Sequence, residues 1–433
     1  MIAFTKVRAE FCNQGIKGGY IYMKKRLIPL LLVSTLMASC KGAEASKWDA
    51  KTAFGDKELN YCLLIGQIDH NDSAARTAGI RDALKTRGNK NTNPNTENPV
   101  QGKLTLNGTE YTVNEIEHSE QKATGGATWD QQTATSTTEG WFNKNGSKID
   151  FIVSNNDGMA EGAIAASNYI DGTPIFGYDS NASTLDLIKQ GKIMGTVNQD
   201  PSAQVAGIFM LARNIMDGVS NPLEDGFTKD SANGYGKIPS TFVYHEDDKS
   251  LLVNNFAITS SNIDKYVGKT TADLVYSDVK KGTTGEKNVM FSTYSQSDTF
   301  LNSNVNPLVE KYKTTFNFKL DNTAVGDGND DKSVLDKMLK TFDAYILNTV
   351  KTTSAKSYLD KIYTLEGGSE TISKPVIFYN RQPTDQNGKV DKTVMTDSRF
   401  SNIYYVGFDA NQGGQVQGQM IVDYLTAQEK LSK

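Results

Sequence analysis

Residues 61–76 read YCLLIGQIDHNDSAAR, and they decide the fold class of this 433-residue chain. The first five form an apolar run typical of a buried strand, and the stretch that continues to Gly88 has apolar side chains at helical spacing. A buried strand, a tight polar turn and a helix together make a βα unit. Four hydrogen-bonding side chains, Asp69, His70, Asp72 and Arg76, follow the point where this strand ends.

The same alternation of short apolar runs and helical patterns continues along the chain, which predicts parallel sheets covered by helices. The predicted strands are YCLLIG, DFIVSN, PIFGYDS and KIMGTV in one half, and NVMFSTY, FDAYILN, KPVIFYNRQ and IYYVGFD in the other. Two halves of matching design imply an α/β protein with two Rossmann-like lobes and a hinged cleft between them.

The expected division of the chain follows these patterns. Ahead of the lobes we expect an upstream extension and signal peptide over 1–39 and a lipidated tether over 40–57. We expect lobe one to comprise 58–198 and about 251–268, lobe two about 199–250 and 288–433, and a polar linker 269–287.

The segment MKKRLIPLLLVSTLMASC, from Met23 to Cys40, has the pattern of a bacterial targeting signal. Its basic start precedes an apolar stretch that is too short to cross a bilayer, and Met23 is the expected start of the protein. Leu36–Cys40 resembles a relaxed lipobox, so Cys40 is predicted to be acylated and to hold a soluble body on a membrane surface in the periplasm. The alternative is an ordinary cleaved signal that ends near an accidental cysteine.

Composition and motifs exclude several classes of protein. The 46 basic and 50 acidic residues contain no basic run beyond the start, which argues against a nucleic-acid partner. Cys62 would be the lone cysteine in the mature body, so neither a disulfide nor a cysteine metal cluster is expected. The chain has no phosphate-binding loop and no nucleophile elbow, so a binding protein is favoured over an enzyme; a glycosidase stays as an alternative.

Polar residues gather where the predicted strands end, which is where open α/β sheets bind ligands. A single Asp in such a place is often a helix cap, but many such residues in both halves favour a polar binding site. Paired donors and acceptors suit the adjacent hydroxyls of a sugar. Trp129 and Phe300 would offer flat apolar faces to the sugar ring, unless they are core aromatics. The polar candidates are Asp72, Arg76, Asn156, Asp157, Asp179, Gln199, Asp298, Asn348, Asn380 and Arg381.

At these residues the chain resembles the bacterial periplasmic glucose/galactose-binding proteins, the substrate-binding subunits of sugar ABC importers. GQIDHNDSAAR, WDQQTA, DFIVSNNDGMAEGAI and IKQGKIMGTVNQD are similar to the second half of the family, whereas YSQSDTF, KPVIFYNRQP and YYVGFDANQGGQVQGQMI are similar to its first half. This order resembles a circularly permuted lipoprotein member, in which residues 269–287 would bridge the family's old termini.

The resemblance implies the role of each candidate residue. Trp129 and Phe300 would sandwich a pyranose, and Asp298 would accept a hydrogen bond from its 4-hydroxyl. Gln199 stands where the family has Asn, which could shift the preference between glucose and galactose. The other implied hydroxyl contacts are His70, Asp72, Arg76, Asn156, Asp179 and Asn348.

The family's calcium loop is mostly absent from this chain. Asp56, Glu58, Asn60 and the distant Asp150 match it, while two upstream positions are Thr52 and Phe54. We therefore expect no metal or other cofactor, with calcium as the open alternative.

The resemblance implies a monomeric sugar-binding lipoprotein that delivers glucose or galactose to an ABC permease in the inner membrane. The alternative is a sugar sensor that reports its occupancy to a chemoreceptor.

Overall fold

The computed structural model describes residues 5–7, 21–23, 47–219, 222–223, 242–267, 285–298 and 300–433. The chain divides into two compact units, residues 1–46 and 47–433. In the first unit, β1 (Thr5–Val7) pairs antiparallel with β2 (Ile21–Met23). The predicted targeting segment after Met23, the lipidation site at Cys40 and all but the end of the predicted linker 269–287 lie outside the described residues. None of the helices in the described ranges combines the length and the apolar character that a membrane span requires.

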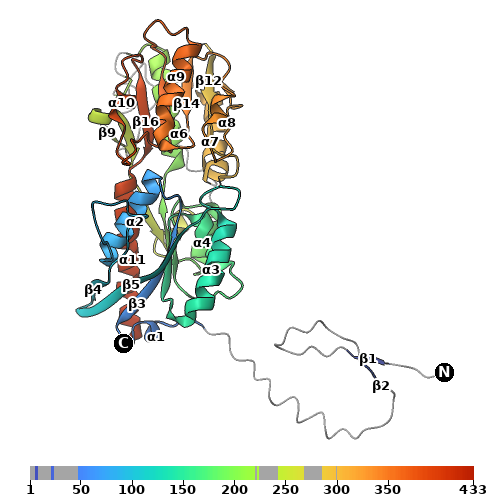
Figure 1. The fold of residues 1–433 in the computed structure, drawn as a ribbon, viewed down its shortest axis with the longest axis vertical. Helices are drawn as coiled ribbons and strands as arrows, with labels where there is room; N and C mark the ends of the chain where they lie inside the picture. The colour runs from blue at the N-terminus through green and yellow to red at the C-terminus, as the bar shows by residue number, and fades with distance from the viewer. Residues whose placement is uncertain are drawn as a thin grey trace, which may run out of the picture. The chain divides into compact units, whose positions relative to one another are not determined.

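Lobe one of the second unit is built on a seven-stranded sheet with the order β11-β8-β7-β6-β3-β5-β4 (Figure 1). The five inner strands pair in parallel, and the edge strands β4 and β11 are antiparallel to their neighbours. The central apolar run 61–65 is buried throughout, as expected for a parallel strand that is covered on both faces. The strands are β3 Glu58–Ile65, β4 Gly102–Leu106, β5 Thr109–Glu120, β6 Phe151–Ser154, β7 Ile175–Phe176, β8 Gly195–Asn198 and β11 Phe256–Thr259.

The helices of lobe one begin at polar caps directly after the strands. The side chains of His70, Asp130 and Asn156 each accept a hydrogen bond from a backbone N–H in the first turn of the following helix. These caps fix where the chain turns from strand to helix, and they place polar residues at the carboxyl ends of the strands. The helices are α1 Ala50–Ala53, α2 Asn71–Leu84, α3 Gln131–Asn145, α4 Asp157–Ile164, α5 Ala182–Lys189 and α11 Ala410–Ser432, with 3₁₀ turns at Gly146–Lys148 and Ile263–Lys265.

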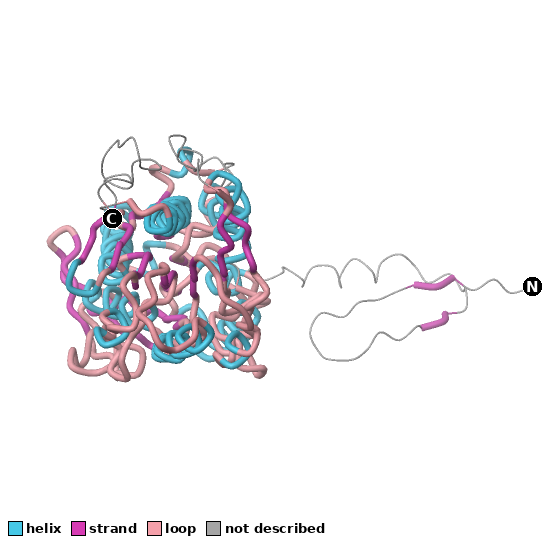
Figure 2. The backbone as a smooth tube through the Cα atoms, turned by 90° about the horizontal axis from the view of Figure 1, so that it is seen from above, coloured by secondary structure: helices cyan, strands magenta, loops and turns pink. Residues whose placement is uncertain are grey.

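Lobe two has a second seven-stranded sheet, in the order β13-β12-β14-β15-β16-β10-β9, in which only β9 is antiparallel to its neighbour. Helices lie around the strands when the lobes are seen from above (Figure 2). The strands are β9 Phe242–His245, β10 Ser250–Val253, β12 Lys287–Phe291, β13 Phe318–Asp321, β14 Ala344–Leu347, β15 Val376–Tyr379 and β16 Ile403–Phe408. The helices are α6 Pro201–Met216, α7 Asn306–Thr315, α8 Lys332–Leu335, α9 Ala355–Leu365 and α10 Lys392–Met395, with a π-helical turn at Leu301–Val305 and 3₁₀ turns at Glu246–Asp248 and Thr352–Ser354.

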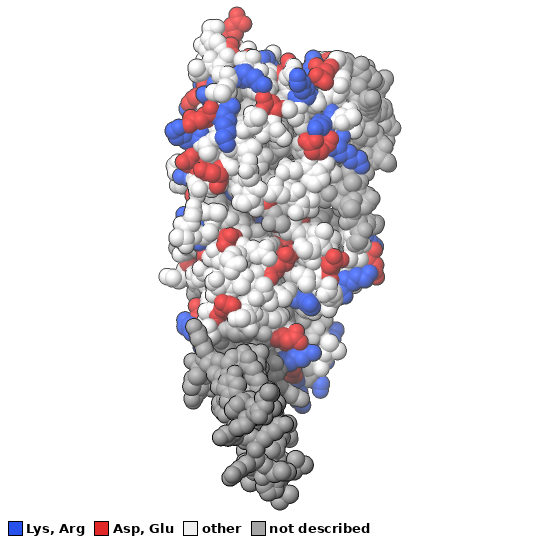
Figure 3. Space-filling model, turned by 90° about the vertical axis from the view of Figure 1, so that its right-hand side faces the viewer, with Lys and Arg blue, Asp and Glu red and all other residues white. Residues whose placement is uncertain are grey.

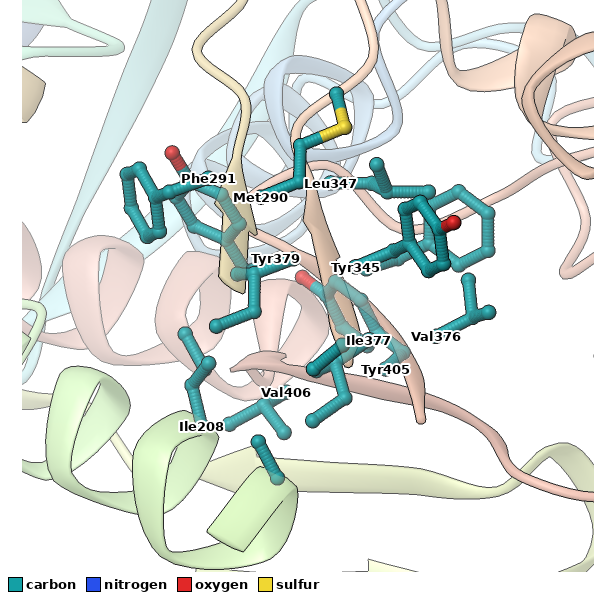
Figure 4. Packing of buried hydrophobic residues seen from close by; sticks show 14 of the residues in the cluster. Ile208, Met290, Phe291, Tyr345, Leu347, Val376, Ile377, Tyr379, Tyr405 and Val406 are labelled. Atoms are coloured by element: carbon teal, nitrogen blue, oxygen red, sulfur yellow. The ribbon is translucent and has the colours of Figure 1, made fainter. Parts of the chain in front are cut away.

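The core of lobe two forms where α6 lies on the sheet. Ile208 of α6 and the strand residues Ile377 and Val406 belong to one buried apolar cluster (Figure 4). On the face of the molecule shown in Figure 3, the Lys and Arg side chains of the described residues lie among Asp and Glu side chains.

The sequence-based division of the chain was wrong at four places. Residues 251–253 were assigned to lobe one, but β10 pairs with β16 in the sheet of lobe two. The tether was expected to run to residue 57, but Phe54 is buried and packs edge-on against Tyr111 at 5.5 Å, so residues from α1 onward belong to lobe one. Lys287 was assigned to the linker but begins β12.

The fourth error concerns the end of the chain, because α11 was assigned to lobe two and packs on lobe one beside α2 (Figure 1). The two helices approach so closely that a Cβ added at Gly79 would lie 2.1 Å from the Gly414 backbone. Gly418 is equally confined, since a Cβ there would lie 2.5 Å from the Gly79 carbonyl oxygen. Glycine at these positions therefore allows α11 to cross from the end of β16 onto lobe one.

Candidate functional site

A pocket lies between the lobes, and both sheets contribute residues from the carboxyl ends of their strands. Its cavity volume is about 40 Å³, so in this arrangement the side chains of the two lobes nearly fill the space between them. Its lining residues are His70, Asp72, Arg76, Trp129, Asn156, Asp179 and Gln199 from lobe one, and Tyr294, Asp298, Phe300, Asn380 and Arg381 from the segments that follow the strands of lobe two.

The first turns of α2 form the charged wall of the pocket in lobe one. The Nδ1 atom of His70 accepts from the backbone N–H of Asp72 at 3.1 Å, so the other ring nitrogen, Nε2, is the donor of the neutral imidazole. Arg76 donates from Nη1 to the carbonyl oxygen of Asn155 at 2.7 Å and lies 3.5 Å from a carboxylate oxygen of Asp179. The guanidinium group is also stacked 3.7 Å from the ring centre of Tyr178, which fixes its plane.

Trp129 is held in place by a glycine on the neighbouring strand end. A Cβ added at Gly66 would lie 2.2–2.5 Å from three carbon atoms of the indole, so the ring rests directly on the Gly66 backbone. Trp129 itself has a positive φ of 60°, which directs its side chain away from the regular path of the chain. The indole also meets the edge of His70 at 5.5 Å, and it remains partly exposed toward the pocket.

Lobe two provides a matching wall of aromatic and charged groups. The Tyr294 hydroxyl donates to Asp298, whose other carboxylate oxygen accepts from the backbone N–H of Leu301 at 2.7 Å. The Arg381 guanidinium is stacked 3.6 Å from the ring centre of Tyr294. Phe300 lies at the pocket with its ring 6.1 Å from that of Phe408, so it is both a core residue and a lining residue.

Burial changes the protonation of the pocket. Burial lowers the pKa of His70 well below its ordinary value, and the positive charges of Arg381 and Arg76 lower it further. Burial raises the pKa of Asp72 to about 6 against the opposing effect of the two arginines. Burial likewise raises the pKa of Asp179 to about 7, although Arg76 opposes the rise.

Several buried polar atoms of the pocket have no hydrogen-bond partner among the described residues. They are Nε of Arg76, Oε1 of Gln199 and Nε of Arg381. A buried polar atom without a partner costs about 1–3 kcal/mol, so a bound polar ligand that satisfies these atoms would stabilise the structure.

Side chains of the two lobes also touch beside the pocket. Asn304 of lobe two donates from Nδ2 to Oδ1 of Asn181 in lobe one at 2.8 Å, and both residues are buried. Arg381 donates to Oε1 of Gln67 at 3.4 Å. Direct hydrogen bonds between side chains therefore join the two lobes beside the pocket.

The structure brings nine of the ten predicted ligand residues together around one pocket. The tenth, Asn348, is not among the lining residues: it follows β14, is fully buried, and its backbone N–H donates to Oγ of Ser292 at 2.9 Å, so its contact with a ligand stays a prediction. Asn380, at the end of the adjacent strand β15, lines the pocket in its place. Asn380 and Arg381 were named as polar candidates at a strand end but were not among the ten residues that the resemblance implied, and Tyr294 was not predicted.

The residues that match the family's calcium loop do not fit a metal site. Asp150 accepts from the backbone N–H of Asn60 at 2.7 Å, and the Asn60 side-chain oxygen accepts from Asn114 at 3.0 Å. Across the described ranges, no group of three or more His, Cys, Asp or Glu residues is arranged to hold a metal ion.

Segments in both halves of the chain match models of known protein families. Residues 41–220 match one family model of a periplasmic binding protein domain, and residues 286–355 match a second. These two segments of the chain are similar to periplasmic binding protein domains. The two α/β lobes with mostly parallel sheets have the architecture of the type I periplasmic binding proteins.

One relative is a D-galactose/methyl-galactoside binding periplasmic protein of Haemophilus influenzae, 28% identical over 181 residues. The match covers 41% of this chain and 46% of the relative, so the chain spans about half the length of this curated relative. Two solved structures are ABC transporter solute-binding proteins, one from Clostridium phytofermentas with bound L-rhamnose and one from Agrobacterium vitis with bound D-fucose. They are 12% and 8% identical, cover 86% and 85% of this chain and 82% and 90% of their own chains, and have a TM-score of 0.45. With TM-scores below 0.5, these two likenesses carry no conclusion about this chain.

Proposed function

We propose that this periplasmic binding protein binds D-glucose or D-galactose between its lobes and delivers the sugar to an ABC permease. The observation that carries the proposal is the single pocket in which polar side chains from both lobes surround Trp129 and Phe300. Such a pocket offers hydrogen-bonding groups to the rim of a hexose and aromatic surface to its faces.

Each wall has a definite part in this proposal. Neutral His70 donates from Nε2, Arg76 and Arg381 donate from unpartnered nitrogens, and the carboxylates of Asp179 and Asp298 accept from sugar hydroxyls. Because the donors are fixed by stacking and by backbone hydrogen bonds, they are already oriented before the sugar arrives. The sugar would favour the closed arrangement of the lobes because it contacts both of them.

The cellular setting belongs to the same proposal. The family points to the periplasm, and the lipobox-like segment before Cys40 would anchor the protein to a membrane surface near its permease. We propose that binding proceeds without a cofactor, in keeping with the poor fit of residues 56–60 and Asp150 to a metal site.

A circularly permuted order of the family's two halves is also part of the proposal. It is supported by the packing of α1 against α11, which puts the two ends of the unit 47–433 side by side on lobe one (Figure 1). Neighbouring surface termini are the condition under which a chain can be cut and rejoined elsewhere without loss of its fold.

The proposal is tested by calorimetric titration of the protein with glucose, galactose, ribose and xylose. We expect binding of at least one of the two hexoses, and a loss of about ten- to a hundredfold in its affinity in Asp298→Ala, since an unmatched hydroxyl costs about 1–3 kcal/mol. Asp298→Asn serves as a control for folding because its amide oxygen can still accept from Leu301. Hexose binding by Asp298→Ala as tight as that of the parent would refute the assignment of the site.

A further inference from the structure

A second cavity, which we call the side chamber, adjoins the pocket between the lobes. Its cavity volume is about 190 Å³, compared with about 40 Å³ for the pocket. The pocket and the chamber share Trp129, Asn156, Tyr294 and Asp298, so the two spaces meet along this wall. The remaining walls that matter here are Thr128, Asp130 and Gln131 of lobe one and Ser295, Ser297 and Gly328 of lobe two.

The walls of the side chamber are polar and carry free hydrogen-bonding capacity. The hydroxyls of Ser295 and Ser297 contact each other at 3.0 Å, and the Ser295 oxygen also accepts from the backbone N–H of Ser297 at 3.2 Å, which leaves the Ser297 hydroxyl able to accept from a further donor. The Thr128 hydroxyl donates to Gln67 at 3.3 Å and can accept in the same way. Hydroxyl groups on both sides and an indole edge at the entrance suit a second sugar ring better than an apolar group.

Two glycines keep the side chamber open. Gly158 lies in the first turn of α4, and a Cβ added there would have Asn156 at 3.9 Å as its nearest neighbour, so a larger side chain would extend into free space. Gly328 has a φ of 82°, which disfavours any residue with a side chain. At Gly158, where the backbone accepts a side chain, a larger residue could close the wall next to Trp129, so a site for free hexoses alone has no need of this space.

We propose that the side chamber receives a second sugar ring joined to the hexose in the pocket, so that the ligands include disaccharides as well as hexoses. This inference rests on the proposed hexose site. The hexose ring lies against Trp129, the glycosidic bond passes the wall shared by Trp129 and Asp298, and the second ring lies among the hydroxyls of Thr128, Ser295 and Ser297.

The test is calorimetric titration of the full chain with glucose, galactose, maltose, cellobiose, lactose, melibiose and trehalose. We expect the parent to bind at least one disaccharide within about tenfold of its better hexose. Gly158→Leu should keep its hexose affinity within about twofold and lose at least about tenfold in disaccharide affinity. Gly140→Leu is the matched control, because Gly140 lies exposed in α3 of the same lobe with no atom within 4 Å of an added Cβ.

Each outcome is decisive for one of the two proposals. Hexose binding without any disaccharide binding would refute the proposed role of the side chamber and would agree with the proposed function. Binding of neither class overturns the proposed function. A disaccharide affinity of Gly158→Leu equal to that of the parent would also refute the proposed role of the side chamber. If Gly158→Leu loses the hexose as well, Ser297→Tyr blocks the chamber from the exposed opposite wall, and unchanged disaccharide affinity in that variant overturns the inference.

Discussion

Replacing Gly66 by Ala should remove sugar binding with little change in the fold. An added Cβ would lie 2.2 Å from the Trp129 indole, whereas ordinary contacts begin near 3.4 Å, so the ring must move by more than one ångström. Trp129 is partly exposed on its pocket side, and the strand end behind Gly66 cannot retreat, because the backbone N–H of Gly66 is held by Asn155 at 3.2 Å. The indole therefore moves toward the pocket and into the space of the ligand.

The expected magnitude follows from what the displaced ring would lose. Aromatic contacts contribute about 0.5–1.5 kcal/mol beyond the area they bury, and the ring would also obstruct the ligand, so hexose affinity should fall by at least about tenfold. The free energy of unfolding should change by less than about 1 kcal/mol, because the indole relaxes outward and a Gly-to-Ala change reduces the entropy of the unfolded chain.

Both quantities can be measured on one preparation, by tryptophan fluorescence titration and by urea unfolding. Gly140→Ala is the control, since the exposed helical Gly140 has no atom within 4 Å of an added Cβ and should keep the parent affinity. Hexose affinity and bound-state fluorescence in Gly66→Ala that equal those of the parent would contradict the placement of the indole against the ligand.

Four further outcomes are expected. Asn304→Ala removes the 2.8 Å hydrogen bond to Asn181 between the lobes, which contributes about 0.5–1.5 kcal/mol. Stopped-flow fluorescence should therefore show that the sugar dissociates about two- to tenfold faster from the variant. An unchanged dissociation rate would mean that this contact does not hold the lobes closed. Burial, aided by nearby negative charge, raises the pKa of Asp150 to about 7, above its value in the unfolded chain. The contribution of Asp150 to stability is therefore greatest below about pH 4 and is lost as the pH rises toward 7, by at most about 1.4 kcal/mol per pH unit. In urea unfolding, the stability of Asp150→Asn should fall less steeply over this range than that of the parent, and an identical pH profile would contradict this account. Arg81→Met leaves Glu115 buried without its guanidinium partner and should cost about 3–5 kcal/mol in urea unfolding, a prediction that a loss below 1 kcal/mol would refute. Sugar affinity should be the same before and after dialysis against EDTA, and a fall that Ca²⁺ restores would contradict the absence of a metal requirement.

The sequence predicted the local elements, and nine of the ten residues that it singled out lie together at the pocket. The βα units were visible because a strand and the helix after it depend on side chains a few residues apart, through alternation, helical spacing and capping residues such as His70 and Asn156. Because parallel strands all end at the same edge of a sheet, residues that directly follow these strands were bound to converge, and the nine residues did so without any knowledge of the tertiary packing.

The structure alone decided features that depend on contacts between distant parts of the chain. The sequence pattern around Asn348 and Asn380 is the same, with an amide after a buried strand, and only the position of each strand in the sheet determines that Asn380 reaches the pocket while Asn348 is enclosed. The glycines of α11 likewise indicate that another segment of backbone approaches this helix closely, and only the tertiary packing identifies that segment as α2 of lobe one. Local sequence determined which elements form, because propensity and capping act over a few residues. Tertiary structure decided which lobe each element joins and which side chains line the pocket, because those outcomes depend on surfaces that are far apart along the chain.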